Sequence, residues 1–226
     1  HAEDARPNVV IIMTDQQSAE AMSCVQGTQY LNTPAMDRLA REGVRFTHAH
    51  APNPICVPAR CSLFTGRYSH EIAVQDNDDR QSFDDGRFPC LGALFRDGGY
   101  DTAYIGKWHM NFSEERTDVH GFEHMAVTRA NGADALRPAA LREYLEQPRT
   151  KPFLLVASFI NPHNICEWAR GESLPDGDVG TPPAADGCPP LRANHAPQEK
   201  EPDVIALVRE SYHASKTFPV GDFDDT

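Results

Sequence analysis

Hydrophobic residues occur in short runs that are separated by amphipathic or polar segments. Residues 9–13 (VVIIM) and 153–160 (FLLVASFI) are almost continuously apolar and do not alternate with polar positions. Such runs are typical of strands that are buried on both faces of a parallel sheet. Residues 102–105 (TAYI) read as a further strand, and residues 44–46 (VRF) read as a short one. We therefore predict strands at these four places.

Segments with a helical pattern lie between these runs. Thr33 is a suitable N-cap, Pro34 suits the first helical position, and Gly43 ends this helix. Further helices are predicted around residues 91–95, 141–145 and 204–208. The order strand, helix, strand, helix, strand predicts an α/β fold with a parallel-rich sheet flanked by helices.

Three prolines shape the segment around Cys56. Pro52, Pro54 and Pro58 keep it out of regular structure, and Pro58 suits the first turn of a helix that ends at Gly66. Cys56 is therefore predicted to lie just before a helix N-terminus. A free cysteine is most often a small buried hydrophobe, but this setting among prolines favours a functional role.

Polar residues follow the ends of the predicted strands. Asp15 follows the first strand, Lys107 and His109 follow the middle one, and His163 follows the last. In open α/β sheets, ligands bind beyond the carboxyl ends of the strands. Any one of these residues alone would be an ordinary solvated residue. Together with Cys56, they favour a site that combines a carboxylate, a cation and two imidazoles.

The composition argues against two kinds of partner. A formal net charge of -12 over 226 residues disfavours a nucleic-acid groove, because phosphate binding needs clustered Lys and Arg. The apolar runs are well short of the length that crosses a membrane, so no membrane span is expected.

The six cysteines show no metal-finger spacing. Because the chain opens without Met, a periplasmic or secreted location and a cytoplasmic one both stay open.

Residues 54–66 (PICVPARCSLFTG) closely resemble the type I sulfatase signature, whose core is C-x-P-x-R. Supporting segments occur in the family's order at residues 8–16, 32–34, 99–109 and 161–163. The resemblance is clearest over residues 7–163. It implies a formylglycine-dependent sulfatase of the alkaline phosphatase superfamily, with an alkaline-phosphatase-like α/β fold.

The resemblance implies that Cys56 is the precursor of the nucleophile. A maturation enzyme would oxidise it to Cα-formylglycine, and the hydrated aldehyde carries two geminal hydroxyls. One hydroxyl attacks the sulfur of a sulfate ester, and the second later expels inorganic sulfate. A sulfate monoester repels nucleophiles through its own charge, so this chemistry needs an activated oxygen and positive groups around it.

The resemblance also implies roles for the residues at the strand ends. Arg60 would hold and orient the formylglycine. Lys107 and His109 would bind the sulfate and the hydroxyls, and His163 would bind sulfate or donate a proton to the leaving oxygen. The residues implied as ligands of a divalent cation, expected to be calcium, are Asp15, Gln16 and the modified Cys56.

The sequence departs from the family pattern in its second half. Family members add a distal Asp followed by Asn or His, and a further Lys, and no such segment is found here. Asp222, Asp224 and Asp225 lie in an unpatterned tail, residues 217–226, and are not assigned as ligands. Residues 167–202 read as a loop or insertion. We therefore expect the N-terminal part of a truncated sulfatase catalytic domain, completed by a C-terminal segment in the same chain or another.

These observations leave three functions to compare. The first is a metal-dependent hydrolase of sulfate monoesters, acting on a sulfated small molecule or glycan. The second is a phosphonate monoester or phosphodiester hydrolase of the same family. The third is an incomplete, inactive chain that only binds sugars or a partner, in which Cys56 would stay unmodified.

Overall fold

A computed structural model describes residues 6–77, 87–128, 132–181, 183–192, 196 and 199–214. The predicted tail, residues 217–226, lies outside this part of the chain. The chain divides into two units, one made of residues 1–16 and 47–162 and the other of residues 17–46 and 163–226. The first unit contains the sheet, and the second is helical and irregular.

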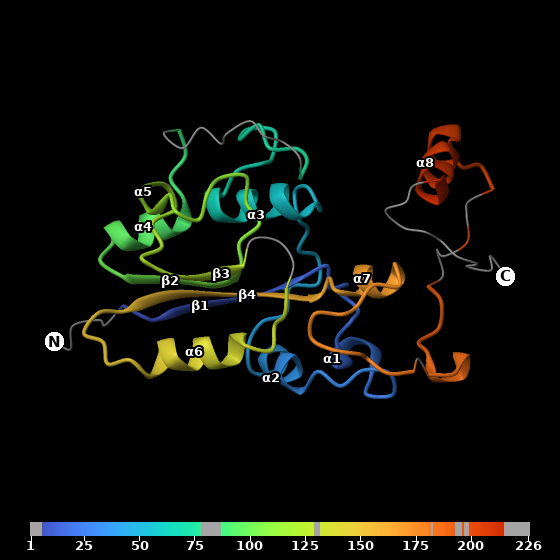
Figure 1. Cartoon of the computed structure of the whole chain (residues 1–226), viewed down its shortest axis with the longest axis horizontal. Helices are drawn as coiled ribbons and strands as arrows, with labels where there is room; N and C mark the ends of the chain where they lie inside the picture. Colours follow the sequence, from blue (N-terminus) through green and yellow to red (C-terminus); the bar gives the residue numbers. More distant parts are fainter. Residues whose placement is uncertain are drawn as a thin grey trace. The chain divides into compact units, whose positions relative to one another are not determined.

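A parallel sheet of four strands forms the centre of the first unit (Figure 1), and its strands have the order β1-β4-β2-β3 among the described residues. The strands are β1 Val9–Asp15, β2 Asp101–Lys107, β3 His124–Thr128 and β4 Phe153–Pro162. All three pairings are parallel. The strands predicted around residues 9–13, 102–105 and 153–160 are confirmed, while β3 was not predicted.

The register brings the carboxyl ends of the strands to one edge of the sheet. Asp15 of β1 is level with Pro162 of β4, and Gly106 of β2 is level with Ser158 of β4. A side chain placed on Gly106 would begin 1.8 Å from the carbonyl oxygen of Ser158, so only glycine allows β2 and β4 to approach this closely here. The strand ends that carry the polar residues are therefore neighbours.

Two expectations about strands were wrong. Strand β1 is not buried on both faces, because Val10 and Ile12 are 48% and 61% exposed at the edge of the sheet. Residues 44–46 do not form a strand, and Val44 and Phe46 are 78% and 79% exposed. In both places the sequence shows an apolar run, but it does not show whether another part of the protein packs against that run.

Helices lie on both faces of the sheet in the first unit. Helices α3 Cys56–Thr65, α4 Leu91–Asp97 and α5 Thr117–His120 lie on one face, and α6 Arg137–Glu146 lies on the other (Figure 1). Alternate residues of the central strands pack into these two layers. The first core contains Phe64, Tyr104, Trp108, Phe122, Leu154 and Val156, and the second contains Ala103, Ile105, Tyr144, Phe153 and Leu155. Burial on both faces explains the continuous apolar runs of β2 and β4.

Helix α3 begins two residues earlier than predicted. Cys56 is its first residue, Ile55 is the N-cap, and Pro58 falls inside the first turn, where a missing N–H costs no helical hydrogen bond. Gly66 ends the helix as predicted, in the left-handed conformation with a φ of 65°. Cys56 is thus held by the helix backbone and does not belong to the preceding loop.

The second unit contains α1 Ser23–Gln26, α2 Pro34–Glu42, α7 Ile165–Ala169, a 3-10 turn Ala185–Gly187 and α8 Asp203–Ala214. Thr33 is the N-cap of α2, but its hydroxyl accepts from the amide of Ser23 and donates to Asp37. Helix α7 includes residues 167–169, so the loop predicted from residue 167 begins later. No helix in the described residues could span a membrane.

Candidate active site

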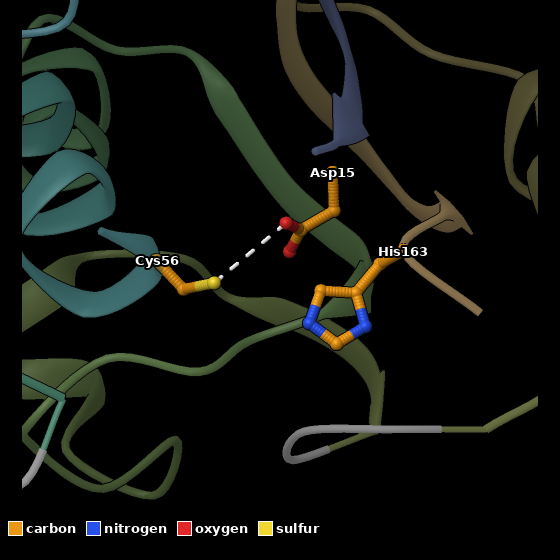
Figure 2. Close-up of side chains that lie close together, drawn as sticks. All are labelled: Asp15, Cys56 and His163. Atoms are coloured by element: carbon orange, nitrogen blue, oxygen red, sulfur yellow. Dashed lines mark hydrogen bonds between the residues drawn. The ribbon is translucent and has the colours of Figure 1, made fainter. Parts of the chain in front are cut away.

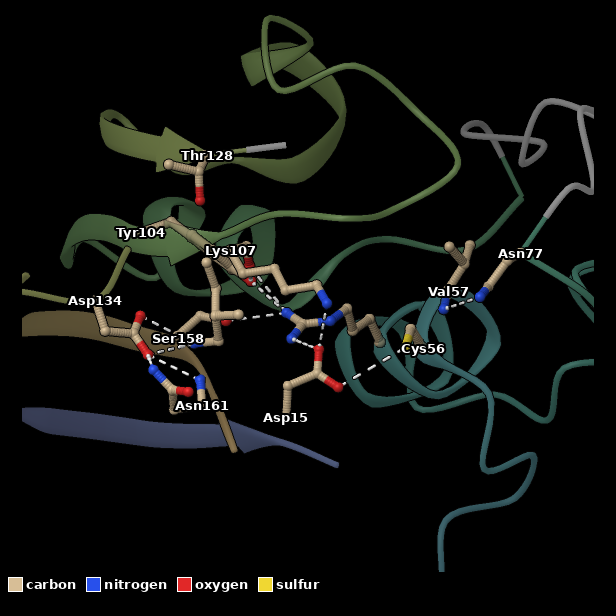
Figure 3. A network of polar contacts seen from close by, with 12 residues as sticks. Asp15, Cys56, Val57, Asn77, Tyr104, Lys107, Thr128, Asp134, Ser158 and Asn161 are labelled. Atoms are coloured by element: carbon tan, nitrogen blue, oxygen red, sulfur yellow. Dashed lines mark hydrogen bonds and ion pairs between the residues drawn. The ribbon is translucent and has the colours of Figure 1, made fainter. Parts of the chain in front are cut away.

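Arg60 connects helix α3 to three strands of the sheet. Its partners Asp15, Tyr104, Lys107 and Ser158 are labelled in Figure 3. Its Nη1 donates to the Tyr104 hydroxyl at 3.2 Å, to the Lys107 carbonyl at 2.9 Å and to the Ser158 hydroxyl at 2.9 Å. Its Nη2 donates to Asp15 Oδ2 at 2.9 Å. The side chain is only 4% exposed. A planar guanidinium with several fixed donors suits this role, which the single ammonium of a lysine could not fill.

Asp15 receives two cations on the same oxygen. Lys107 Nζ lies 2.7 Å from Asp15 Oδ2, the atom that also accepts from Arg60. Asp15 ends β1 and Lys107 ends β2, with β4 between them, so the long lysine side chain spans the width of one strand. Lys107 is fully buried and Asp15 is 7% exposed.

The ion pairs decide the protonation of Asp15. Burial by itself raises the pKa of this carboxyl, but hydrogen bonds and charge attraction from Lys107 and Arg60 outweigh burial and hold the pKa below its ordinary value. Asp15 is therefore negative at neutral pH. One carboxylate between two cations leaves one unit of net positive charge, which favours an anionic ligand.

Cys56 lies against the other oxygen of the same carboxylate. Its Sγ donates to Asp15 Oδ1 at 3.7 Å (Figure 2). Burial, followed by the negative charge of Asp15, raises the pKa of the thiol, although Lys107 and Arg60 oppose this shift. The thiol is protonated at neutral pH. Because the thiolate is the reactive form of cysteine, unmodified Cys56 is a poor nucleophile.

Asn77 holds the start of helix α3. The backbone amide of Val57, next to Cys56, donates to Asn77 Oδ1 at 2.9 Å. The N-cap residue Ile55 has no side-chain acceptor, so Asn77 satisfies one of the first amides that a helix leaves without an internal partner. This residue was not predicted from the sequence, because it lies 20 positions away in an irregular segment.

The two predicted histidines lie beside strand ends in the chain. His109 follows β2 by two residues, is half-buried and has a positive φ of 44°. His163 is half-buried and follows Pro162, the last residue of β4, which is level with Asp15 in the sheet. Gln16 is exposed, with a φ of 63°. Of the predicted site residues, the structure therefore brings together Asp15, Cys56, Arg60 and Lys107 by direct contacts in the first unit.

The model of the family described as Sulfatase matches residues 7–212. The chain belongs to the sulfatase family. This confirms the resemblance that was predicted from the segment around Cys56. The match also extends beyond residue 163, where the sequence motifs end.

Curated relatives support the assignment to the sulfatase family. The chain is 41% identical over 125 residues to the N-acetylglucosamine-6-O-sulfatase of Bacteroides thetaiotaomicron, covering 55% of this chain and 21% of that protein. It is 32% identical over 197 residues to the uncharacterized sulfatase YidJ of Escherichia coli, covering 70% of this chain and 39% of that protein. The chain thus spans well under half the length of these sulfatases.

A solved sulfatase structure supports the fold. It is described as a complex with its substrate D-glucosamine-2-N,6-O-disulfate, is 31% identical to this chain and has a TM-score of 0.58. The match covers 70% of this chain and 35% of the solved chain. The predicted parallel α/β fold of the alkaline phosphatase type is therefore confirmed for this sulfatase-family chain.

Proposed function

We propose that this chain carries the nucleophile and the first anion-binding groups of a sulfate monoester hydrolase. The observation that carries the proposal is the shared carboxylate, with Arg60 and Lys107 both on Asp15 Oδ2 and Cys56 against Oδ1. This arrangement puts buried positive charge beside the residue of the family signature that becomes formylglycine. A sulfate ester is an anion that needs this neutralisation before a nucleophile can approach it.

The modification solves the problem of the unreactive thiol. Formylglycine replaces the Cys56 sulfur by an aldehyde, and its hydrate presents two hydroxyls at that place. One hydroxyl loses its proton and attacks the sulfur of the ester, the bond from sulfur to the alcohol oxygen breaks, and the alcohol leaves with a proton. The second hydroxyl then loses its proton, the carbon–oxygen bond to sulfate breaks, and the aldehyde re-forms. Water restores the hydrate.

The other residues bind, orient and transfer protons. Lys107 Nζ has three donors and pairs with Asp15 at 2.7 Å, which leaves donors that suit a sulfate oxygen. Arg60 orients the start of α3 against the sheet. We assign His109 to the hydroxyls and sulfate, and His163 to sulfate or to the proton that the leaving alcohol needs.

A divalent cation, proposed to be calcium, suits part of this residue set. Asp15 offers a carboxylate oxygen, and formylglycine at residue 56 offers a hydroxyl oxygen in place of a soft sulfur; both are hard ligands of the kind calcium prefers. Gln16 is exposed and adds at most an amide oxygen. A cation held here would supply charge neutralisation and would make the formylglycine hydroxyl more acidic. Because calcium prefers 6–8 oxygens, we place its remaining ligands in a further segment.

That further segment would also complete the sheet. Val10 and Ile12 of the edge strand β1 are exposed apolar residues, which is the kind of surface a sheet extension or a packed element covers. We propose that a C-terminal segment, in the same protein or supplied in trans, covers this edge and adds the distal metal ligands and a second Lys. The 226 residues alone should therefore bind calcium weakly and turn over little substrate.

A sulfated glycan is the proposed substrate class. The similar proteins include an N-acetylglucosamine-6-O-sulfatase and a structure with a disulfated glucosamine. A sulfated amino sugar presents the anionic ester that Lys107 and Arg60 suit. The maturation enzyme that converts Cys56 is the second expected partner.

The test is made on the full protein that contains this sequence, produced with a formylglycine-generating enzyme. Mass spectrometry of the peptide with residue 56 first shows conversion of Cys56. Matured protein is then assayed with an aryl sulfate and an aryl phosphonate, with Cys56→Ala as control. Sulfate turnover that disappears in the control supports the proposal. Preference for the phosphonate assigns the alternative hydrolase, and an unconverted Cys56 with no turnover points to an inactive chain.

A further inference from the structure

Asp134 binds the end of strand β4 in an arrangement that the site described above does not use. Its two carboxylate oxygens accept from the backbone amide of Ile160 at 2.9 and 3.0 Å. Oδ2 also accepts from the backbone amide of Asn161 at 2.8 Å and from its side-chain amide at 3.1 Å (Figure 3). Two successive backbone amides that converge on one anion form a compact anion-binding nest.

Arg137 connects the same carboxylate to strand β3. Its Nε lies 2.9 Å from Asp134 Oδ1, and its Nη2 donates to the Thr128 hydroxyl at 2.7 Å. The carbonyl of Thr128 in turn accepts from the backbone amide of Trp108 at 2.9 Å. Trp108 lies between Lys107 and His109 in the chain. The Asp134–Arg137 pair therefore contacts the end of β4 directly, and it reaches the segment with Lys107 and His109 only through Thr128.

Both members of the pair are shielded from water. The side chains of Asp134 and Arg137 are 13% and 7% exposed. Separating a buried ion pair is costly, because each charge is then left without its partner in a place that water does not reach. A buried pair with several hydrogen bonds therefore holds its neighbours more rigidly than a surface pair does. The carbonyl of Asp134 also accepts from the Arg137 amide at 2.9 Å, which fixes the carboxylate to the start of α6.

We propose that Asp134 is a positioning residue, which sets the carboxyl end of β4 and thereby the ring of His163 two residues beyond Asn161. It does not touch the reacting atoms. Through Arg137 and Thr128 it also steadies the backbone at Trp108, between Lys107 and His109. This inference rests on the proposed function, since it gives His163 the task of supplying a proton to the leaving oxygen.

The pairing of acceptors and donors makes Asp134→Asn the informative change. Asparagine has nearly the same size, but it removes the charge that pairs with Arg137 and turns one acceptor into a donor that faces the amides of Ile160 and Asn161. Asn161→Ala is the matched control, because it removes the side-chain hydrogen bond to Asp134 and keeps both backbone donors. Thermal unfolding of both variants shows that they are folded.

The kinetic readout compares two leaving groups in the matured full protein. An aryl sulfate leaves without much protonation, whereas an alkyl or sugar sulfate needs a proton on the departing oxygen. Asp134→Asn should lower kcat for the alkyl sulfate by about 10²-fold, as expected for a small misplacement of a reacting group. The fall for the aryl sulfate should be clearly smaller, with KM little changed. Equal losses for both substrates, or no loss, overturn the inference.

A second readout does not depend on turnover. In folded protein, Asp134→Asn should speed hydrogen exchange at the amides of Ile160 and Asn161 and shift the ring resonances of His163, while Asn161→Ala does so less. Unchanged His163 resonances overturn the inference even if exchange rises. If the matured wild-type protein hydrolyses no sulfate ester, the proposed function fails, and these resonances still decide whether Asp134 positions His163.

Discussion

The guanidinium of Arg60 donates a hydrogen bond of 2.9 Å to the backbone carbonyl of Lys107. The Tyr104 hydroxyl donates to the same carbonyl at 2.7 Å. The end of β2 is thus fixed to helix α3 through a buried side chain, and the ammonium of Lys107 is directed to Asp15 from a backbone that cannot shift freely. The position of the Lys107 ammonium and the position of Cys56 at the start of α3 therefore depend on one another.

Arg60→Lys should destabilise the protein although it keeps the charge. A lysine cannot reproduce the four hydrogen bonds that the guanidinium makes to Asp15, Tyr104, Lys107 and Ser158. Because each hydrogen bond to a charged group contributes about 1.5–3 kcal/mol, we expect a loss of at least about 2 kcal/mol. Urea unfolding measures it. Arg38→Lys, in an exposed pair with Glu42, is the control and should change little.

Asp15→Asn should be most harmful near neutral pH. A carboxyl whose pKa is lower in the folded state contributes stability that is complete above its unfolded value and is lost as the pH falls through the folded value. For Asp15 that loss begins below about pH 3.8. Removing this partner of two buried cations should cost about 3–5 kcal/mol at pH 7. Urea unfolding of both proteins should give a smaller difference at pH 3 than at pH 7, and a constant difference would contradict this explanation.

The cysteines should differ in their rates of alkylation in protein made without the maturation enzyme. Burial raises the pKa of Cys61 to about 11, and burial together with Asp15 raises that of Cys56. At pH 7, iodoacetamide should therefore modify the exposed Cys24 and Cys188 before Cys56, and Cys61 last. Asp15→Asn should speed the reaction of Cys56, because it removes the negative neighbour and keeps both cations. Peptide mapping over time gives the order, and equal rates at Cys24 and Cys56 would refute it.

Substitutions at the strand ends should lower turnover in the matured full protein. Lys107→Ala removes a donor from the place where sulfate charge is proposed to bind, so kcat should fall about 10²-fold or more. His109→Ala and His163→Ala should act similarly. Steady-state kinetics with an aryl sulfate and with a sulfated sugar measures the effect. Near-normal rates in all three variants would show that these residues do not share one site.

The central strands could be predicted because burial on both faces of a sheet requires a continuous run of apolar residues. Strands β2 and β4 are covered by helices on each side, and their runs are continuously apolar. Strand β3 has five residues, none of them fully buried, and it begins with an exposed histidine. Its sequence therefore has no long apolar run by which it could be predicted. Residues 44–46 have strand-like composition but find no strand partner among the described residues. The local sequence pattern therefore indicates that a segment could form a strand, but it does not show whether a neighbouring strand is available to pair with it.

The site residues that lie within family motifs could be predicted from the sequence. Asp15, Cys56, Arg60 and Lys107 come from segments that resemble the family, and the structure brings them into contact. Tyr104 and Ser158 were missed because they are neutral residues inside strands, and they gain a role only from Arg60, which lies 44 and 98 positions away. Gln16, predicted as a metal ligand, is exposed, and its role stays a prediction.

The burial of the first turns of α3 has a consequence for the proposed conversion of Cys56. Val57 is 2% exposed and Arg60 4%, and the Arg60 side chain is occupied by hydrogen bonds inside the protein. An enzyme that recognises Cys56 through its neighbours Pro58 and Arg60 cannot reach them once this helix has docked on the sheet. If Cys56 is converted as proposed, the converting enzyme is expected to act on this segment before the helix docks, so that folding ends the period in which residue 56 can be modified.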